Sequence, residues 1–317
     1  MLKNSRVLIT GATGFIGANL LRRCLKEGAQ VCILACAGSA NWRIADVKKE
    51  AVEYEVDVRD YARLENVVSK VRPEIVFHLA AYGVYPFQSD NSLIMNTNVL
   101  GTANLLNACR KNGFKRFVAT GTAVEYGVKS SPLVETDLLE PVTDYGVSKA
   151  ASTLLCQAVG RREDLPITIL RLFTPFGDFE EKGRLISTVI TSCLKKRALK
   201  LAVPGFVRDF SYISDVVDAF INVADNSNSA GNGEIYNIAN GREYTIGQAV
   251  EIMLKLLNSK IKPEWGSLAP HGVKAGVQQA DISKAGRVLN WSPKYSFEQG
   301  LSETIKWFEK NISLYTE

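Results

Sequence analysis

The stretch RVLITGATGFIGANLLRRCLKEG, residues 6–28, decides the fold of this chain. It begins with residues typical of a buried strand, continues through three spaced glycines, and ends in an amphipathic helix that stops at Gly28. In such a unit Gly11 permits a tight turn, Gly14 lets the backbone approach a pyrophosphate, and Gly17 lets the helix pack closely on the sheet. The N–H groups at the helix start face the anion. The stretch therefore predicts a dinucleotide site, and the absence of a following Gly-Lys-Ser/Thr excludes a nucleoside-triphosphate loop.

Short apolar strands alternate with amphipathic helices along the first half of the chain. After the opening strand, strands are predicted within 30–35, 52–58, 73–81, 115–127 and 166–177, and helices within 61–71, 92–113 and 147–159. This alternation predicts the α/β class, with a Rossmann-type doubly wound parallel sheet that helices cover on both faces.

The pattern changes after about residue 174, where loops lengthen and Pro and Gly become more frequent. We expect a dinucleotide-binding domain over 1–173 and a smaller substrate-binding lobe that takes up most of 174–317. Segments near 210–240 are expected to return to the first domain. The segment DNSNSAGNGE, 225–234, has the composition of a surface loop.

Composition limits the class of protein. The chain has 317 residues, 46% of them hydrophobic, and a small net charge of +5, so nucleic acid is not an expected partner. Six cysteines stand in apolar contexts without a C-x-x-C pair, which is typical of reduced thiols and predicts no metal site. We expect no signal peptide, no membrane partner and a cytoplasmic location.

Tyr145 and Lys149 stand four residues apart in TDYGVSKA, residues 143–150. Thr143 or Asp144 can cap a helix here, and the spacing of four places both side chains on one helix face. A cation beside a phenol favours its anionic form, which makes proton exchange easier near neutral pH. Taken alone, the pair also fits an ordinary surface contact.

The end of the second strand bears on the choice of dinucleotide. The segment VCILACAGSANWRI, 31–44, contains no acid to accept a ribose 2′-hydroxyl, and the first acid after it is Asp46. Ser39, Asn41 and Arg43 could instead hold a 2′-phosphate, Arg43 in a bidentate manner. NADP is therefore the expected cofactor, and NAD stays possible.

With these features in this order, the chain resembles the extended short-chain dehydrogenase/reductases. Within that group it is similar to the NAD(P)-dependent nucleotide-sugar epimerases, dehydratases and reductases. The motifs that carry the resemblance span essentially the whole chain: DVRD (57–60), HLAA (78–81), NTNVLGT (96–102), TAVEYG (122–127), YGVSK (145–149), RDFSYISDVVDA (208–219) and DISKAGRVLNW (281–291).

The resemblance implies roles for individual residues. Tyr145 is the expected general acid/base on a sugar oxygen, Lys149 is expected to hold the nicotinamide ribose and to lower the tyrosine pKa, and Thr122 is expected to hydrogen-bond the same sugar oxygen. Arg184 and Arg208 are expected to contact the substrate, Arg208 through its phosphates. The residues expected at the cofactor are Gly11, Thr13, Gly14, Phe15, Ile16, Gly17, Ser39, Asn41, Arg43, Asp57, Val58, Leu79, Ala80, Ala81, Asn98, Tyr145 and Lys149.

Departures from the family pattern narrow the reaction. The dehydratases carry an Asp-Glu pair directly after the threonine, whereas this chain has Ala123 and Val124 there. Glu125 stands where the family usually has an apolar residue, and its role stays open. The segment PHGV replaces the family's Arg-x-Gly-Asp/Glu, with His271 and Lys274 as possible substitutes.

His78, at a strand end, is expected to be packed structurally, because a chain with two histidines gives a Ser-His-Asp triad little support.

These observations favour NADPH-dependent reduction of a nucleotide-linked 4-keto-6-deoxyhexose. The alternative is an NAD-dependent nucleotide-sugar 4-epimerase, which needs the same Tyr, Lys and Thr. A third hypothesis, of another class, is a non-enzymatic NAD(P)-binding sensor on the same fold. The resemblance also implies a homodimer, with helices at 92–111 and 145–160 paired across the two-fold axis.

Overall fold

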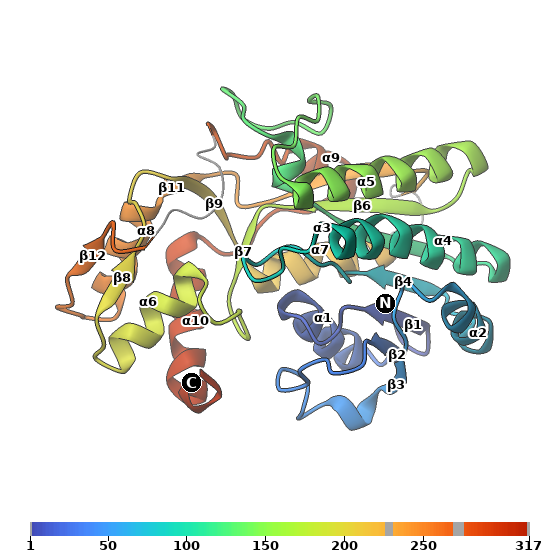
Figure 1. Cartoon of the computed structure of the whole chain (residues 1–317), viewed down its shortest axis with the longest axis horizontal. Helices are drawn as coiled ribbons and strands as arrows, with labels where there is room; N and C mark the ends of the chain where they lie inside the picture. Colours follow the sequence, from blue (N-terminus) through green and yellow to red (C-terminus); the bar gives the residue numbers. More distant parts are fainter. Residues whose placement is uncertain (1, 226–230, 269–275, 316–317) are drawn as a thin grey trace.

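The computed structural model describes residues 2–225, 231–268 and 276–315. Its larger sheet has seven parallel strands in the order β10-β6-β5-β4-β1-β2-β3 (Figure 1). The strands are β1 (Arg6–Thr10), β2 (Gln30–Ala35), β3 (Val52–Glu55), β4 (Ile75–His78), β5 (Arg116–Thr122), β6 (Ile167–Leu172) and β10 (Glu234–Ile238). The chain order reverses at β1, and ligands bind at the carboxyl ends of the strands beside such a switch point. The predicted fold class is confirmed.

Helices cover both faces of this sheet. They are α1 (Phe15–Lys26), α2 (Tyr61–Val71), α4 (Gly101–Asn112), α5 (Asp144–Glu163), α7 (Ile213–Asp225) and α9 (Ser283–Leu289). Alternation along β1 shows why two layers form: Val7 and Ile9 join the core that includes α1 and α7, while Leu8 joins the core under α2, α4 and α5.

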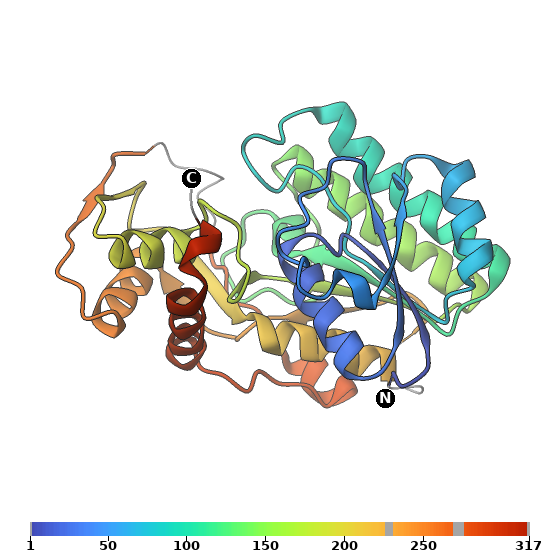
Figure 2. The ribbon, with the colours of Figure 1, turned by 90° about the horizontal axis from the view of Figure 1, so that it is seen from below.

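A smaller lobe stands beside the large sheet (Figure 2). It contains the sheet β11-β9-β7, the pair β12-β8 and three helices. Its elements are β7 (Thr174–Phe176), α6 (Leu185–Leu194), β8 (Leu199–Leu201), β9 (Val207–Tyr212), β11 (Glu243–Thr245), α8 (Ile246–Leu256), β12 (Pro263–Trp265) and α10 (Phe297–Asn311). One hydrophobic core runs from Val7 in the large sheet to Phe297 in this lobe, so the two parts share an interior.

The helix predicted over 92–113 is divided in the structure. It comprises α3 (Asn91–Met95), a π-helical turn η2 (Asn96–Leu100) and α4. The Gly101 N–H bonds to the Asn96 carbonyl, five residues back, which widens the helix there. Such turns are frequent at functional sites.

Short helices complete the chain: η1 (Lys48–Glu50), η3 (Ala123–Tyr126) and η4 (Ile312–Tyr315). Within the described ranges, no helix combines the length and apolar character needed to cross a bilayer. The loop predicted over 225–234 falls partly on residues 226–230, which lie outside the described residues.

Candidate active site

The glycine turn after β1 has the shape of a pyrophosphate site. Gly11 has a φ of +73°, and a Cβ on it would lie 2.7 Å from the Ala80 nitrogen. A Cβ on Gly17 would overlap the Gly11 carbonyl. Helix α1 starts after Gly14 without a side-chain cap, so its first N–H groups are left for an anionic ligand. The residues present therefore fit a dinucleotide.

The other residues predicted to bind the cofactor surround this turn. They come from the turn and the start of α1 (Thr13, Phe15, Ile16), the loop after β2 (Ser39, Asn41), the segment after β3 (Asp57, Val58) and the end of β4 (Leu79, Ala80, Ala81). The Asn41 Oδ1 is buried without a hydrogen-bond partner, which leaves an acceptor available in the loop after β2. Hydrogen bonds from Arg59 lower the pKa of Asp57 and keep it ionised.

Arg43 is placed differently from the expectation. It is 5% exposed, and its guanidinium donates to the Phe179 carbonyl at 2.9 Å, to the Thr13 carbonyl at 3.4 Å and to the Glu181 carboxylate at 2.7 Å. All three of its nitrogens therefore have protein partners. The sequence could not show this, because Glu181 lies 138 residues away. The prediction that Arg43 holds a 2′-phosphate stays a prediction, and in this structure Arg43 is bonded to protein groups instead.

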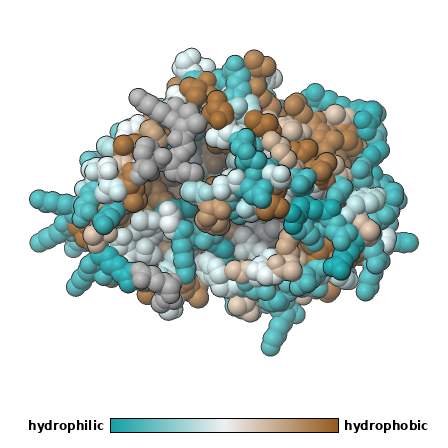
Figure 3. Space-filling view, in the orientation of Figure 1, coloured by the Kyte–Doolittle hydropathy of each residue, from teal (hydrophilic) through white to brown (hydrophobic). Residues whose placement is uncertain are grey.

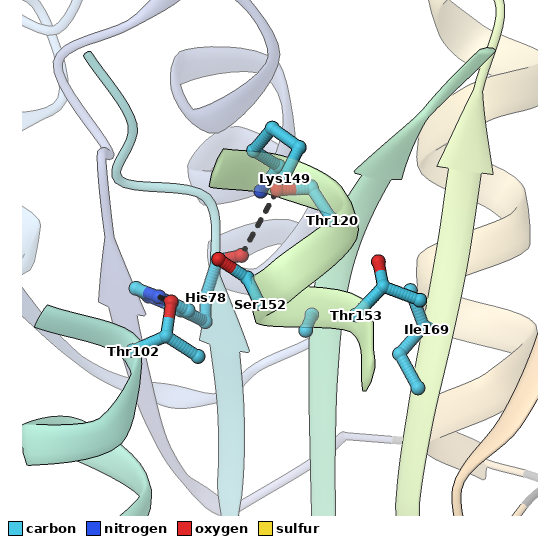
Figure 4. Close-up of a pocket in the computed structure, with 8 residues that line it drawn as sticks. His78, Thr102, Thr120, Lys149, Ser152, Thr153 and Ile169 are labelled. Atoms are coloured by element: carbon cyan, nitrogen blue, oxygen red, sulfur yellow. Dashed lines mark hydrogen bonds between the residues drawn. The ribbon is translucent and has the colours of Figure 1, made fainter. Parts of the chain in front are cut away.

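Helix α5 carries Tyr145 and Lys149, and its N-cap is Thr143, whose side chain accepts from the Gly146 N–H at 3.0 Å. Lys149 is 3% exposed and lies beside Thr120, Ser152 and His78 at the inner end of the site (Figure 4).

The phenol of Tyr145 meets other charges. Burial raises the pKa of Tyr145, Glu125 and Tyr85 add to the rise, and Arg184 is the cation that opposes it. The prediction that Lys149 lowers the Tyr145 pKa stays a prediction. In this structure the cation that opposes the rise is Arg184, which comes from the smaller lobe.

Asn98, within the π-helical turn, ties the site together. Its amide accepts from the Tyr82 N–H and donates to the Ser148 Oγ, both at 2.8 Å. Its carbonyl accepts from the Ser152 Oγ at 2.6 Å and the Thr102 Oγ1 at 2.5 Å. Asn98 thus fixes the turn of α5 that bears Lys149.

His78 is a structural residue, as expected. The Thr102 hydroxyl donates to the Asn98 carbonyl, so it accepts from the His78 Nε2–H at 2.9 Å. The Nδ1 atom therefore accepts from Thr10, whose Oγ1 lies 2.8 Å away and itself accepts from the Leu79 and Ala80 N–H groups. Burial lowers the pKa of His78 to about 3, so it stays neutral.

Thr122 ends β5 and caps η3, with the Glu125 side chain accepting from its backbone N–H at 2.8 Å. Thr122 is thereby held at the carboxyl edge of the sheet.

Two arginines from the smaller lobe complete the site. The charge of Arg184 lowers the pKa of Arg208, as burial also does, so two cations lie near each other. Such a pair suits a substrate diphosphate. The Arg184 guanidinium also lies 6.0 Å from the centre of the Phe15 ring, beside the glycine turn.

Sequence reasoning missed Glu180. It is 1% exposed and binds the Arg184 Nε at 3.1 Å, while its other oxygen has no partner. Burial raises its pKa to about 7. The one sequence signal for this ion pair was that Glu180 and Arg184 stand four residues apart.

The prediction that His271 or Lys274 substitutes for the family's Arg-x-Gly-Asp/Glu segment is untested, because both residues lie outside the described residues. Among the residues with assigned structure, no three His, Cys, Asp or Glu side chains group as metal ligands.

With this geometry in view, comparisons with known proteins place the chain. Residues 7–239 match the model of the NAD dependent epimerase/dehydratase family. The chain is 31% identical to a UDP-glucuronate 4-epimerase of Thermodesulfobacterium geofontis, over 97% of both chains. It is 29% identical to a dTDP-glucose 4,6-dehydratase of Haemophilus influenzae, over 97% of this chain and 98% of that protein. The crystal structure of UDP-glucuronic acid 4-epimerase from Bacillus cereus, in complex with UDP-glucuronic acid and NAD, superposes with a TM-score of 0.85 at 26% identity, covering 96% of this chain and 99% of that one.

The fold and site thus define an enzyme of the extended short-chain dehydrogenase/reductase type that acts on nucleotide sugars. The chain belongs to the NAD dependent epimerase/dehydratase family. The non-enzymatic sensor hypothesis is therefore set aside.

Proposed function

We propose that this protein is an NAD-dependent nucleotide-sugar 4-epimerase, with UDP-glucuronate as the first substrate to test. Tyr145 takes the proton from the C4 hydroxyl and returns it, and Thr122 hydrogen-bonds the same oxygen. The glycine turn at Gly11, Gly14 and Gly17 would hold NAD, which would supply reversible hydride transfer at C4 of the sugar. Lys149 holds the nicotinamide ribose, and Arg208 holds the diphosphate. No net oxidation results.

The observation that carries this proposal over the 4-keto-sugar reductase is the engagement of Arg43 by Glu181, Phe179 and Thr13. A reductase that relies on NADPH needs a cation for the 2′-phosphate, and the cation predicted for that task is already paired with the Glu181 carboxylate, which would repel a phosphate. The relative solved with NAD supports the same choice. Ala123 and Val124 offer no proton carrier, which disfavours a 4,6-dehydratase.

The test begins with the protein as purified. Released dinucleotide is expected to be NAD, and the protein is expected to interconvert UDP-glucuronate and UDP-galacturonate without added cofactor. A panel including UDP-glucose and dTDP-glucose defines the sugar. Consumption of NADPH with a 4-keto sugar, and no epimerisation, would return the assignment to the reductase.

Glu181→Ala should shift cofactor preference toward NADP. The substitution releases the Arg43 Nη2 from its 2.7 Å ion pair, and a new charge-assisted bond to a 2′-phosphate adds about tenfold or more in affinity. Competition binding of NAD and NADP measures the ratio. Glu27→Ala, which removes an acid paired with Arg23 on α1, is the control and should leave the ratio unchanged. An unchanged ratio in Glu181→Ala would show that Arg43 does not reach the ribose.

The proposed assembly is a homodimer formed through α5 and the helix that contains η2. Exposed apolar side chains gather there: Leu100 is 54%, Val147 is 42% and Leu154 is 55% exposed. Val147 and Leu154 are seven residues apart and lie on one stripe of α5. Figure 3 shows hydrophobic surface over this region, at the upper right.

Leu154→Glu is expected to yield a monomer, because it places a charge in an apolar interface. Light scattering on the eluting protein measures the mass. Leu256→Glu, at a 40% exposed position on α8, is the matched control and should stay dimeric. A Leu154→Glu variant that keeps the dimer mass would move the interface elsewhere.

A further inference from the structure

Glu125 is a fully buried acid directly behind the proposed catalytic residues. It follows Thr122 by three residues in η3, where the family usually has an apolar side chain. Its exposed fraction is 0%. A buried carboxylate is costly unless its partners compensate for the lost hydration, so its surroundings indicate what it does.

Every hydrogen-bond partner of Glu125 is a donor. Its Oε1 accepts from the Thr122 N–H at 2.8 Å and from the Thr153 hydroxyl at 3.1 Å. Its Oε2 accepts from the Arg171 Nε at 2.8 Å, and Arg171 is 1% exposed. The Thr122 N–H and the Arg171 Nε–H can only donate, whereas the Thr153 hydroxyl can donate or accept. Burial raises the pKa of Glu125, and the charge of Arg171 opposes that rise, so the ion pair with Arg171 favours the charged form of the buried group.

The second buried cation here is Lys149. Burial lowers the pKa of Lys149, and the charge of Glu125 opposes that lowering in part. The same helix provides Thr153, which bonds Glu125, and Lys149, one turn earlier on the site side (Figure 4).

The other groups that face Lys149 do not substitute for Glu125. His78 on β4 is neutral by its hydrogen bonds. Cys156 on α5 is a buried thiol whose pKa is raised by burial to about 12, so it is uncharged near neutral pH. The hydroxyls of Thr120, Thr102 and Ser152 line the same space without charge. Glu125 is thus the anion available to the ammonium.

We propose that Glu125 is a positioning residue of this site, which keeps the Lys149 ammonium charged as its buried counter-ion and anchors the backbone of Thr122. This inference rests on the proposed function, since it assigns Lys149 and Thr122 their roles there. Arg171 is the ion-pair partner that compensates for the lost hydration of the buried Glu125 carboxylate.

The first test follows Lys149 directly in the full-length protein. Lysines carry ¹³C at Cε, and the Lys149 signal is identified by its loss in Lys149→Met. In Glu125→Gln the midpoint of the Lys149 titration should fall by about one pH unit or more, since loss of a nearby opposite charge contributes shifts of this size. The alkaline limb of kcat/KM should fall with it. Asp215→Asn removes another buried carboxylate, bonded to the Lys294 and Tyr295 N–H groups, and should leave the midpoint unchanged.

The second test separates charge from anchoring. Because Glu125→Gln leaves Arg171 without a counter-ion, the variants E125Q/R171M and E125L/R171M are compared. Both lack the buried charges, but only the glutamine keeps an acceptor for the Thr122 N–H. The leucine variant should have a kcat lower by about tenfold or more, because Thr122 is displaced. The Lys149 midpoint should fall in both.

The counter-ion role would be overturned if a folded variant without the Glu125 charge had the same Lys149 titration midpoint as the unmodified protein. Equal kcat values for the two double variants would overturn the anchoring role. If the unmodified protein converted no nucleotide sugar, the proposed function would fail, while the Lys149 titration would still decide the inference about Glu125.

Discussion

Replacing Tyr145 with phenylalanine is expected to lower kcat for epimerisation by about 10²- to 10⁴-fold while NAD stays bound. The phenol is the side chain proposed to exchange a proton with the C4 oxygen, and general acid–base catalysis contributes a factor of this size. The substitution removes one oxygen and leaves the Tyr145 Cβ, which lies 3.5 Å from where a Cβ on Gly83 would stand. Folding and cofactor binding should therefore be little changed.

The measurement is single-turnover conversion of the sugar together with the NAD content of the purified variant. Tyr61→Phe on α2, whose ring packs near Lys111 on the outer surface, is the control for loss of a phenol and should keep full activity. Undiminished turnover in Tyr145→Phe would remove Tyr145 from the chemistry and would direct attention to Glu180, a buried acid whose pKa burial raises to about 7.

The local sequence pattern was sufficient to predict the strands and helices that position the site. Hydrophobic runs and glycine spacing within residues 6–28 predict β1, the turn and α1, because each depends on neighbours along the chain. The four-residue spacing of Tyr145 and Lys149 predicts one helix face for the same reason. The predicted helix 61–71 also coincides with α2.

Charges paired across the fold could not be predicted in this way. Glu181 meets Arg43 from 138 residues away, and Arg171 meets Glu125 from 46 residues away. Arg184, whose charge opposes the rise in the Tyr145 pKa, belongs to the smaller lobe, and local spacing around Tyr145 could not indicate it. The preference for one dinucleotide and the pKa values of the site residues depend on such pairs. This explains why the sequence alone favoured NADP, whereas the relative solved in complex with NAD supports NAD.

Arg171→Met is expected to reduce the free energy of unfolding by about 3–5 kcal/mol, which is the typical cost of leaving one member of a buried ion pair without its partner. Glu125 would keep the bonds from Thr122 and Thr153 but would lose the cation bound 2.8 Å from its Oε2. The stacking of the Arg171 guanidinium over the Tyr126 ring, 4.6 Å from the ring centre, would be lost as well.

The double variant E125L/R171M is expected to recover most of that stability, because apolar side chains of similar size remove both desolvation penalties at once. Urea denaturation at fixed NAD concentration measures all three proteins, and the double-mutant cycle isolates the pair. If the double variant is as stable as the unmodified protein yet poor in catalysis, the charges at Glu125 and Arg171 are retained for Lys149 and Thr122 and not for the fold. A double variant that loses as much stability as Arg171→Met alone would contradict this, since the pair would then be part of what holds η3 against β6.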